Sequence, residues 1–370
     1  MCGFTGFTTR STPPDGGILR AMGDVIRHRG PDDEGYYTDE HCGIAHRRLS
    51  FLDLSNGHQP MSSADGRYII AYNGEAYNYR ELREELIAAG HGFTTNCDTE
   101  VILHGYMEWG PEVTKRLRGM FAFVIWDHQK RELYGARDPF GIKPFYYATM
   151  GELFFFGSEC KSFLPHPGFQ KELNREALKF YLTFQYSALN ESFFKNVFRL
   201  LPGHQLLWRD GAVELSSYHS FSFAPDQTPL DQRAENIRRV VTESVEAHQL
   251  SDVEVGAFLS GGVDSSLIAA LSRPDKTYSV GFDRKGFNET YEAQALCKEL
   301  DLKNVSRIIT EEEFFSALPA IQYYADEPNA NLSTVPLYFL SQLAAKDVKA
   351  VLSGEGADEL FGGYMSYHTT

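Results

Sequence analysis

The sequence predicts two domains of different class, a layered α+β domain followed by an α/β domain built on a parallel sheet. The chain has 370 residues, whereas single hydrophobic cores stop growing at roughly 250 to 300 residues. Its N-terminal part alternates short apolar strands with turns, and its last third alternates strands with helices. The second pattern is typical of a parallel, doubly wound sheet.

Short apolar runs separated by turn residues predict the strands of the first domain, for example at residues 68–72, 121–126, 132–136 and 153–157. Two amphipathic stretches, 79–89 and 99–109, carry apolar residues at helical spacing. Residues 221–231 are rich in Ser, Pro, Asp and Gln without apolar periodicity, which indicates a linker. We therefore expect domains at residues 2–220 and 232–370.

The second domain is expected to alternate strands and helices to its end. In chain order we expect a helix at 232–250, a strand at 253–259, a helix at 265–271, a strand at 277–282, a helix at 291–300, a helical region up to 345 and a strand at 350–352. Ligands of such sheets bind at the carboxyl ends of the strands. The turns after 253–259 and 350–352 are therefore candidate binding loops.

Composition argues against several classes of partner. Hydrophobic residues make up 42% of the chain and charged residues 23%, close to the averages for soluble globular proteins. A formal net charge of −15 opposes attraction to nucleic-acid phosphates and anionic lipid. No apolar run approaches the roughly 20 residues of a membrane span, and no signal peptide is recognisable. The five cysteines are widely separated, so we expect no zinc site and a reducing, cytoplasmic location.

Cys2 directly follows the initiator Met1. A small residue at this position permits removal of Met1, which leaves Cys2 with a free α-amino group. The reference pKa values of an α-amino group and a thiol are about 8 and about 8.5, so the amine can take the thiol proton without a histidine. Cys2 is therefore a candidate N-terminal nucleophile for amide hydrolysis, although a small residue at position 2 alone would be weak evidence.

Several motifs accompany Cys2 and together carry a resemblance. They are CGFTGF from Cys2, RGPD from Arg29, RLS from Arg48, NGE from Asn73, CDTE from Cys97, ARDPFGIKP from Ala136 and LPGH from Leu201. This part of the chain resembles the class II glutamine amidotransferases, and within them the glutaminase domain of asparagine synthetases. The resemblance implies the layered α+β sandwich of N-terminal-nucleophile hydrolases.

The resemblance also implies roles in glutamine hydrolysis. Cys2 would be the nucleophile, Arg48 would bind the glutamine carboxylate, and Asp98 and Glu75 would receive its amino group. Asn73 and the amide of Gly74 would form the oxyanion hole. The chemistry agrees, because an Arg fork suits a carboxylate and two donors suit a tetrahedral oxyanion. Two structural alternatives stay open: Asn73-Gly74 as a tight turn, and Asp98 as the N-cap of the next helix.

Two loops of the second domain indicate a nucleotide site. The first, SGGVDSS from Ser260, follows a strand and opens a helix, where anions are favoured. It lacks the Gly-Lys-Ser/Thr of a Walker A loop and resembles the loop of ATP pyrophosphatases. The second, SGEGADE from Ser353, is a motif that asparagine synthetases carry. The resemblance implies an α/β, ATP pyrophosphatase-like domain, whereas a solvated acidic turn is the structural alternative for the second loop.

By this resemblance, ATP is bound by residues in and beside both loops, namely Leu259, Ser260, Gly261, Gly262, Asp264, Ser265, Val280, Ser353 and Gly354. Glu355 would assist formation or amidation of aspartyl-AMP. Asp264 and Asp358 would bind Mg²⁺, because carboxylate oxygens suit a hard cation shared with phosphates. For Asp326-Glu327-Pro328 we expect a structural turn rather than a contact with substrate.

The resemblance covers essentially the whole chain and implies ATP-dependent synthesis of asparagine from aspartate, with ammonia from glutamine hydrolysis. The intermediate would be aspartyl-AMP, and the products asparagine, glutamate, AMP and pyrophosphate. The implied partners are glutamine, aspartate, ATP and Mg²⁺; a homodimer is left open. Departures such as Ala76 and Pro139 spare the site residues. A sugar-phosphate amidotransferase would share only the first domain with this chain, and the SGGVDSS loop of the second domain argues against that class.

One departure concerns length. Family members continue beyond the segment Gly362-Gly363-Tyr364 with a helical bundle that carries a Lys, so we expect the chain to be incomplete at its C-terminus. Two alternatives follow from this expectation. One is a related amidotransferase that acts on another acid or a peptide, and the other is a chain that retains only glutaminase activity.

Overall fold

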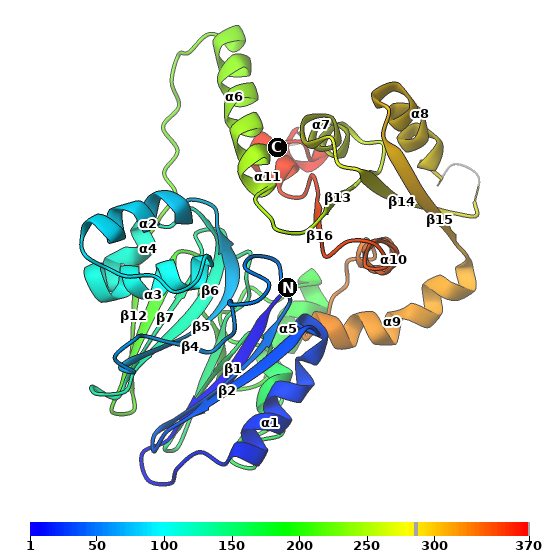
Figure 1. Cartoon of the computed structure of the whole chain (residues 1–370). Helices are drawn as coiled ribbons and strands as arrows, with labels where there is room; N and C mark the ends of the chain where they lie inside the picture. Colours follow the sequence, from blue (N-terminus) through cyan, green and yellow to red (C-terminus); the bar gives the residue numbers. More distant parts are fainter. Residues whose placement is uncertain (285–287, 369–370) are drawn as a thin grey trace. The chain divides into compact units, whose positions relative to one another are not determined.

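The computed structural model describes residues 1–284 and 288–368 and divides into two compact units (Figure 1). Unit 1 comprises Met1–Phe223 and Asp326–Asn329. Unit 2 comprises Ala224–Ala325 and Ala330–Thr370. The segment Asp326–Asn329, which the sequence pattern assigned to the second domain, is thus grouped with the first unit.

Unit 1 contains two antiparallel six-stranded sheets. The first has the order β10-β8-β9-β1-β3-β2, with β1 (Gly3–Thr8), β2 (Asp33–Thr38), β3 (Cys42–Arg48), β8 (Tyr146–Met150), β9 (Leu153–Gly157) and β10 (Val197–Arg199). The second has the order β12-β11-β7-β6-β5-β4, with β4 (Met61–Ser62), β5 (Tyr68–Ala76), β6 (Gly119–Asp127), β7 (Glu132–Arg137), β11 (His204–Arg209) and β12 (Ala212–Ser217). The four strands named from the sequence are confirmed as β5, β6, β7 and β9.

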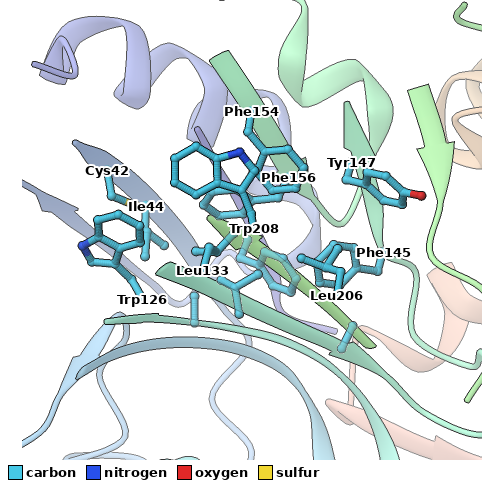
Figure 2. Packing of buried hydrophobic residues seen from close by; sticks show 14 of the residues in the cluster. Cys42, Ile44, Trp126, Leu133, Phe145, Tyr147, Phe154, Phe156, Leu206 and Trp208 are labelled. Atoms are coloured by element: carbon cyan, nitrogen blue, oxygen red, sulfur yellow. The ribbon is translucent and has the colours of Figure 1, made fainter. Parts of the chain in front are cut away.

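The two sheets pack face to face around one apolar core (Figure 2). Phe154 of the first sheet stacks on Trp208 of the second, with ring centroids 5.9 Å apart. Trp126 lies 6.4 Å from Trp208 and is fully buried. Alternate residues of each strand point into this core because side chains alternate along a strand. The strands that carry the site residues described below are therefore anchored in this core.

Helices cover the outer faces of both sheets, which confirms the layered α+β class. On the first sheet, α1 (Gly16–Val25) buries Leu19 and Met22 against Phe7 and Phe155, and the Asp15 carboxylate caps its first turn. On the second sheet, α3 (Asp98–Trp109) packs on β5, and α2 (Tyr79–Ala88) packs on α3 (Figure 1). The other helices of this part are η1 (Arg27–Arg29), η2 (Gly110–Glu112), α4 (Val113–Arg116), η3 (Cys160–Phe163) and α5 (Arg175–Phe184).

Unit 2 is built on a four-stranded parallel sheet of order β15-β14-β13-β16, so the expected α/β class is confirmed. Its strands are β13 (Val255–Phe258), β14 (Lys276–Phe282), β15 (Lys303–Ile309) and β16 (Ala350–Leu352). Its helices are α6 (Leu230–His248), α7 (Val263–Ser272), α8 (Thr290–Leu300), α9 (Glu311–Ala325), α10 (Thr334–Ala344), α11 (Ala357–Phe361) and η4 (Met365–His368).

One prediction for unit 2 is wrong. The stretch Lys303–Ile309 was expected to be helical, but it forms β15 and pairs in parallel with β14 along its whole length. Its β-branched residues favour a strand, and Asn304 donates hydrogen bonds to Thr277 and Ser279 of β14 at 2.9 Å each. In the part of the chain that the structure describes, no helix is both long enough and apolar enough to cross a bilayer.

Candidate active sites

In unit 1, Asn73, Gly74 and Glu75 lie within β5. Gly74 pairs with Phe121 of β6, and a Cβ at position 74 would lie 2.4 Å from the Met120 carbonyl oxygen. The alternative of an Asn-Gly turn is therefore wrong, and the glycine is needed for close strand packing. Among the described residues, no hydrogen-bond partner reaches the buried Nδ2 of Asn73. A buried amide without a protein partner is a donor available to a ligand.

Cys2 precedes the first strand and meets this part of β5 in a small cavity. Because Gly3 of β1 pairs with Arg47 of β3, the start of the chain lies beside Arg48 at the end of β3. The Sγ atom of Cys2 is 3.6 Å from the Leu49 carbonyl oxygen. A cavity of about 40 Å³ is lined by residues that include Cys2, Arg48, Gly74, Glu75 and Asp98. Four separate parts of the sequence thus converge on one site.

Two carboxyl groups face this cavity. Asp98 Oδ2 accepts hydrogen bonds from the Tyr72 hydroxyl and the Ala76 amide, both at 2.9 Å. The N-cap of α3 is Cys97, so the alternative of Asp98 as a helix cap is wrong. Burial and the charge of Asp98 raise the pKa of Glu75 to about 8. Within the described chain, Glu75 Oε1 is buried without a hydrogen-bond partner, and the two carboxyls together suit a cationic ligand group.

Arg48 is held at the cavity wall by main-chain carbonyls. Its Nη2 atom donates to Leu52 O at 2.9 Å and Asp53 O at 2.7 Å. The Asp53 carboxylate in turn accepts from the Asn96 amide at 2.7 Å, close in sequence to Asp98. The Nη1 atom of Arg48 donates to Leu54 O at 3.3 Å, so this loop fixes the guanidinium at the wall of the cavity.

The structure adds two residues that the sequence did not assign. Gln59 lines the cavity and accepts a hydrogen bond from the Tyr72 amide at 2.7 Å. Lys143 is 4% exposed, and its Nζ atom is 3.1 Å from Met1 Sδ. Burial, followed by the charge of Arg29, lowers the pKa of Lys143 to about 8. Lys143 belongs to the motif from Ala136 to Pro144, but from the sequence alone a lysine in a loop is expected to be exposed.

In unit 2, the loop SGGVDSS joins β13 to α7 and folds back on itself. The Oγ atoms of Ser260 and Ser265 lie 2.9 Å apart, and Ser260 Oγ accepts from the Gly262 amide at 3.2 Å. Gly261 has φ of 88°, a left-handed conformation that favours glycine. Among the described residues no side chain caps the first turn of α7, so its amides are available to bind an anion.

The second loop packs directly on the first. A Cβ at position 354 would lie 2.9 Å from Cβ of Asp264 and 3.0 Å from the Ser265 amide nitrogen. Both loops line a cavity of about 500 Å³. It contains all the residues predicted for the nucleotide and adenylation site except Gly261, namely Leu259, Ser260, Gly262, Asp264, Ser265, Val280, Ser353, Gly354, Glu355 and Asp358. The apolar wall from Pro336, Leu337 and Leu340 of α10 was not predicted, because that helix carries no motif.

The carboxylates of this cavity fit a magnesium ion shared with a nucleotide. Asp264 and Asp358 both line it, and among the residues described no three His, Cys, Asp or Glu side chains gather as a metal site. Magnesium commonly takes one or two carboxylates and completes its shell with phosphate oxygens and water. The donor set therefore suits an ion that arrives with a polyphosphate rather than an all-protein cage.

Comparisons with known proteins cover both units. Residues 1–219 match the family model described as glutamine amidotransferase domain, and residues 236–370 match that of asparagine synthase. The chain is 44% identical to asparagine synthetase (glutamine-hydrolyzing) 1 of Bacillus subtilis, over 99% of this chain and 59% of that protein. A putative asparagine synthetase of Mycobacterium bovis is 42% identical, over 99% and 61%, and one of Methanocaldococcus jannaschii is 34% identical, over 99% and 76%. The chain thus spans about three fifths of the length of the first two relatives.

Proposed function

The chain belongs to the family of glutamine-hydrolysing asparagine synthetases, and we propose that it supplies ammonia from glutamine for the ATP-dependent conversion of aspartate to asparagine. The observation that carries this proposal is the cavity of unit 1. It gathers a thiol, a guanidinium and two buried carboxyls, which together match the amide, the carboxylate and the amino group of glutamine.

We infer that glutamine hydrolysis begins at Cys2 after removal of Met1. Although much of Met1 is exposed, burial of its α-amino group lowers the pKa of that amine to about 6. After removal of Met1, the α-amino group of Cys2, whose reference pKa is about 8, would act as the base that accepts the thiol proton. The thiolate attacks the amide carbon, ammonia leaves with the proton from the amine, and water then releases glutamate from the thioester.

Four further residues would bind the substrate and its tetrahedral intermediate. Arg48 offers a planar fork to the glutamine carboxylate, and Asp98 with Glu75 offers negative charge to its α-ammonium group. The unpartnered Nδ2 of Asn73 and the Gly74 amide are the donors for the oxyanion. Each such donor typically contributes about 3 to 4 kcal/mol to the stability of the transition state.

In unit 2, the two loops would bind ATP with its phosphates at the N-terminus of α7. Leu259 and Val280 would line the adenine side, whereas Ser260, Ser265 and the loop amides would hold pyrophosphate. Magnesium bound at Asp264 and Asp358 would neutralise charge on the phosphates. The aspartate carboxylate attacks the α-phosphorus to give aspartyl-AMP and pyrophosphate, Glu355 assists, and ammonia then displaces AMP.

The experiment is incubation with ATP, Mg²⁺, aspartate and glutamine that carries ¹⁵N in its amide. We expect ¹⁵N in the amide of asparagine, together with pyrophosphate. Asp264→Ala should abolish pyrophosphate release and leave glutamate release intact, because the two reactions use different units. Pyrophosphate release with another acid but not with aspartate would instead support a related amidotransferase, and glutamate release alone would restrict the chain to glutaminase activity.

A further inference from the structure

A chain of buried charges connects the nucleophile to a segment far away in the sequence. Arg29 Nε donates to the carbonyl oxygen of Cys2 at 3.0 Å, and Arg29 Nη1 donates to Glu159 Oε1 at 2.8 Å. Lys161 Nζ lies 2.6 Å from Glu159 Oε2 and 3.4 Å from Asp326 Oδ1. All these contacts are internal to unit 1, to which Asp326–Asn329 belongs.

The side chains of this network are withdrawn from water. Those of Arg29, Glu159, Lys161 and Asp326 are 10%, 4%, 8% and 5% exposed. Asp326 also accepts hydrogen bonds from the amides of Cys160 and Lys161, so it closes the network on the turn that carries Glu159. Removing one partner of a buried ion pair leaves an uncompensated charge, and the remaining charges then rearrange.

Arg29 contacts the main chain at Cys2 and at Gly3. Cys2 comes before Gly3, where the pairing of β1 with β3 begins, so Cys2 itself precedes the paired part of the strand. A Cβ at position 3 would lie 2.7 Å from Arg29 Cδ, which means that the arginine packs directly on the backbone beside the nucleophile. Movement of Arg29 would therefore move Cys2 relative to Asn73 and Gly74.

Positive and negative side chains alternate along the network, in the order Arg29, Glu159, Lys161 and Asp326. Two cations, Arg29 and Lys161, face two carboxylates, Glu159 and Asp326, and His28 Nε2 adds a hydrogen bond to Glu159 at 2.9 Å. With Asp326 present, Lys161 is shared between two carboxylates. Without the charge of Asp326, the Lys161 ammonium would pair with Glu159 alone. This would weaken the ion pair between Glu159 and Arg29.

We propose that Asp326 is a positioning residue for the Cys2 nucleophile, acting through Lys161, Glu159 and Arg29. The proposal rests on the glutaminase function proposed above. Asp326 is not among the described residues that line the cavity beside Cys2, so its effect reaches the reaction through the residues that link it to Cys2. The nucleophile thereby depends on a segment that lies in the sequence between α9 and α10.

The test compares Asp326→Asn with a matched control in the same segment, Glu327→Gln. Glu327 accepts from the Tyr146 hydroxyl at 3.1 Å and the Phe193 amide at 3.4 Å, and its ion-pair partner is Arg199, at 3.6 Å, rather than Arg29. Asp326→Asn should lower kcat for glutamine hydrolysis roughly tenfold or more, since a small displacement of a nucleophile has an effect of that order. KM should change less than about twofold, because Arg48, Glu75 and Asp98 are untouched, and Glu327→Gln should alter neither constant by more than that.

A double variant separates positioning from a merely structural role. Lys161→Gln combined with Asp326→Asn removes one cation and one carboxylate, so Glu159 pairs with Arg29 again and kcat should return to within about threefold of the parent. Equal loss of kcat in Asp326→Asn and Glu327→Gln, an unchanged kcat in Asp326→Asn, or no recovery in the double variant would overturn the proposal.

A second measurement does not require glutamine turnover. The rate at which iodoacetamide alkylates Cys2, followed by mass spectrometry, should change in Asp326→Asn and recover in the double variant. If the parent protein releases no glutamate, the proposed function fails, and the alkylation rates still decide whether Asp326 controls the nucleophile.

Discussion

Gly354 packs so closely on Asp264 that a Cβ at position 354 would lie 2.9 Å from the Cβ of Asp264. The nucleotide cavity of unit 2 therefore depends on the absence of a side chain at this position. Gly354→Ala should separate the two loops and weaken ATP binding about tenfold or more, because overpacking of a tight contact costs about 1 to 3 kcal/mol. Calorimetric titration with ATP and Mg²⁺ measures the effect, and glutamate release should be unchanged.

The control for this variant is Gly92→Ala, because among the described residues, apart from its two chain neighbours, none has an atom within 4 Å of a Cβ built at position 92. It should bind ATP like the parent. ATP affinity of Gly354→Ala equal to that of the control would show that the contact does not shape the nucleotide site.

Asn73→Ala should lower kcat for glutamine hydrolysis by about 10² to 10³, the usual effect of losing one oxyanion donor. KM should change little, because the oxyanion forms only in the transition state. The comparison of kcat and KM from initial rates checks this prediction. A large rise in KM at constant kcat would instead assign Asn73 to substrate binding.

Glu75 should make glutamine binding dependent on pH. Burial and the charge of Asp98 raise its pKa to about 8, so below that pH the free site holds a neutral carboxylic acid. The α-ammonium group of glutamine requires the carboxylate, so affinity should fall as pH decreases from 8 to 6, by up to about tenfold per unit.

This pH dependence is measurable by calorimetry on Cys2→Ala, which should bind glutamine without hydrolysing it. The matched variant Cys2→Ala with Glu75→Gln should bind more weakly and lose the dependence in this range. A pH profile that is the same in both proteins would exclude Glu75 as its source.

Glu159 should contribute to the acid sensitivity of unit 1. Burial alone would raise its pKa, but the hydrogen bond from His28 and the charges of Arg29 and Lys161 lower it from 4.5 to about 2. Because the pKa of Glu159 is lower in the folded protein, its carboxylate stabilises the folded state above pH 4.5. This stabilisation is lost as the pH falls toward 2. The loss should be about 3 kcal/mol, seen as a lower free energy of unfolding in urea.

Glu159→Gln is the test of that assignment. Its free energy of unfolding should be lower at pH 7 and should fall less steeply than that of the parent between pH 4.5 and pH 2. If the two proteins lose stability in parallel over this range, other carboxylates account for the acid sensitivity.

The sequence predicted both fold classes because its periodic patterns are local. It failed at Lys303–Ile309, where the strand is decided by pairing with β14, a contact that no local window contains. The motif residues around Cys2 and Asp264 could be predicted because glycines and hydroxyl residues mark those turns directly.

Lys143 and Asp326 could not be predicted in the same way. Each is a charged residue that becomes buried only because distant segments meet around it. From the sequence alone, a charged side chain in a loop is expected to lie in water. Long-range burial of charge is therefore the kind of information that required the structure.

The most direct test of the account is glutamate release from glutamine by the purified protein and by Cys2→Ala, together with the intact mass of the active form. We predict that the active protein lacks Met1, that it releases glutamate, and that Cys2→Ala does not. Release by Cys2→Ala at the parent rate, or activity of a protein that retains Met1, would contradict the assignment of Cys2 as an N-terminal nucleophile.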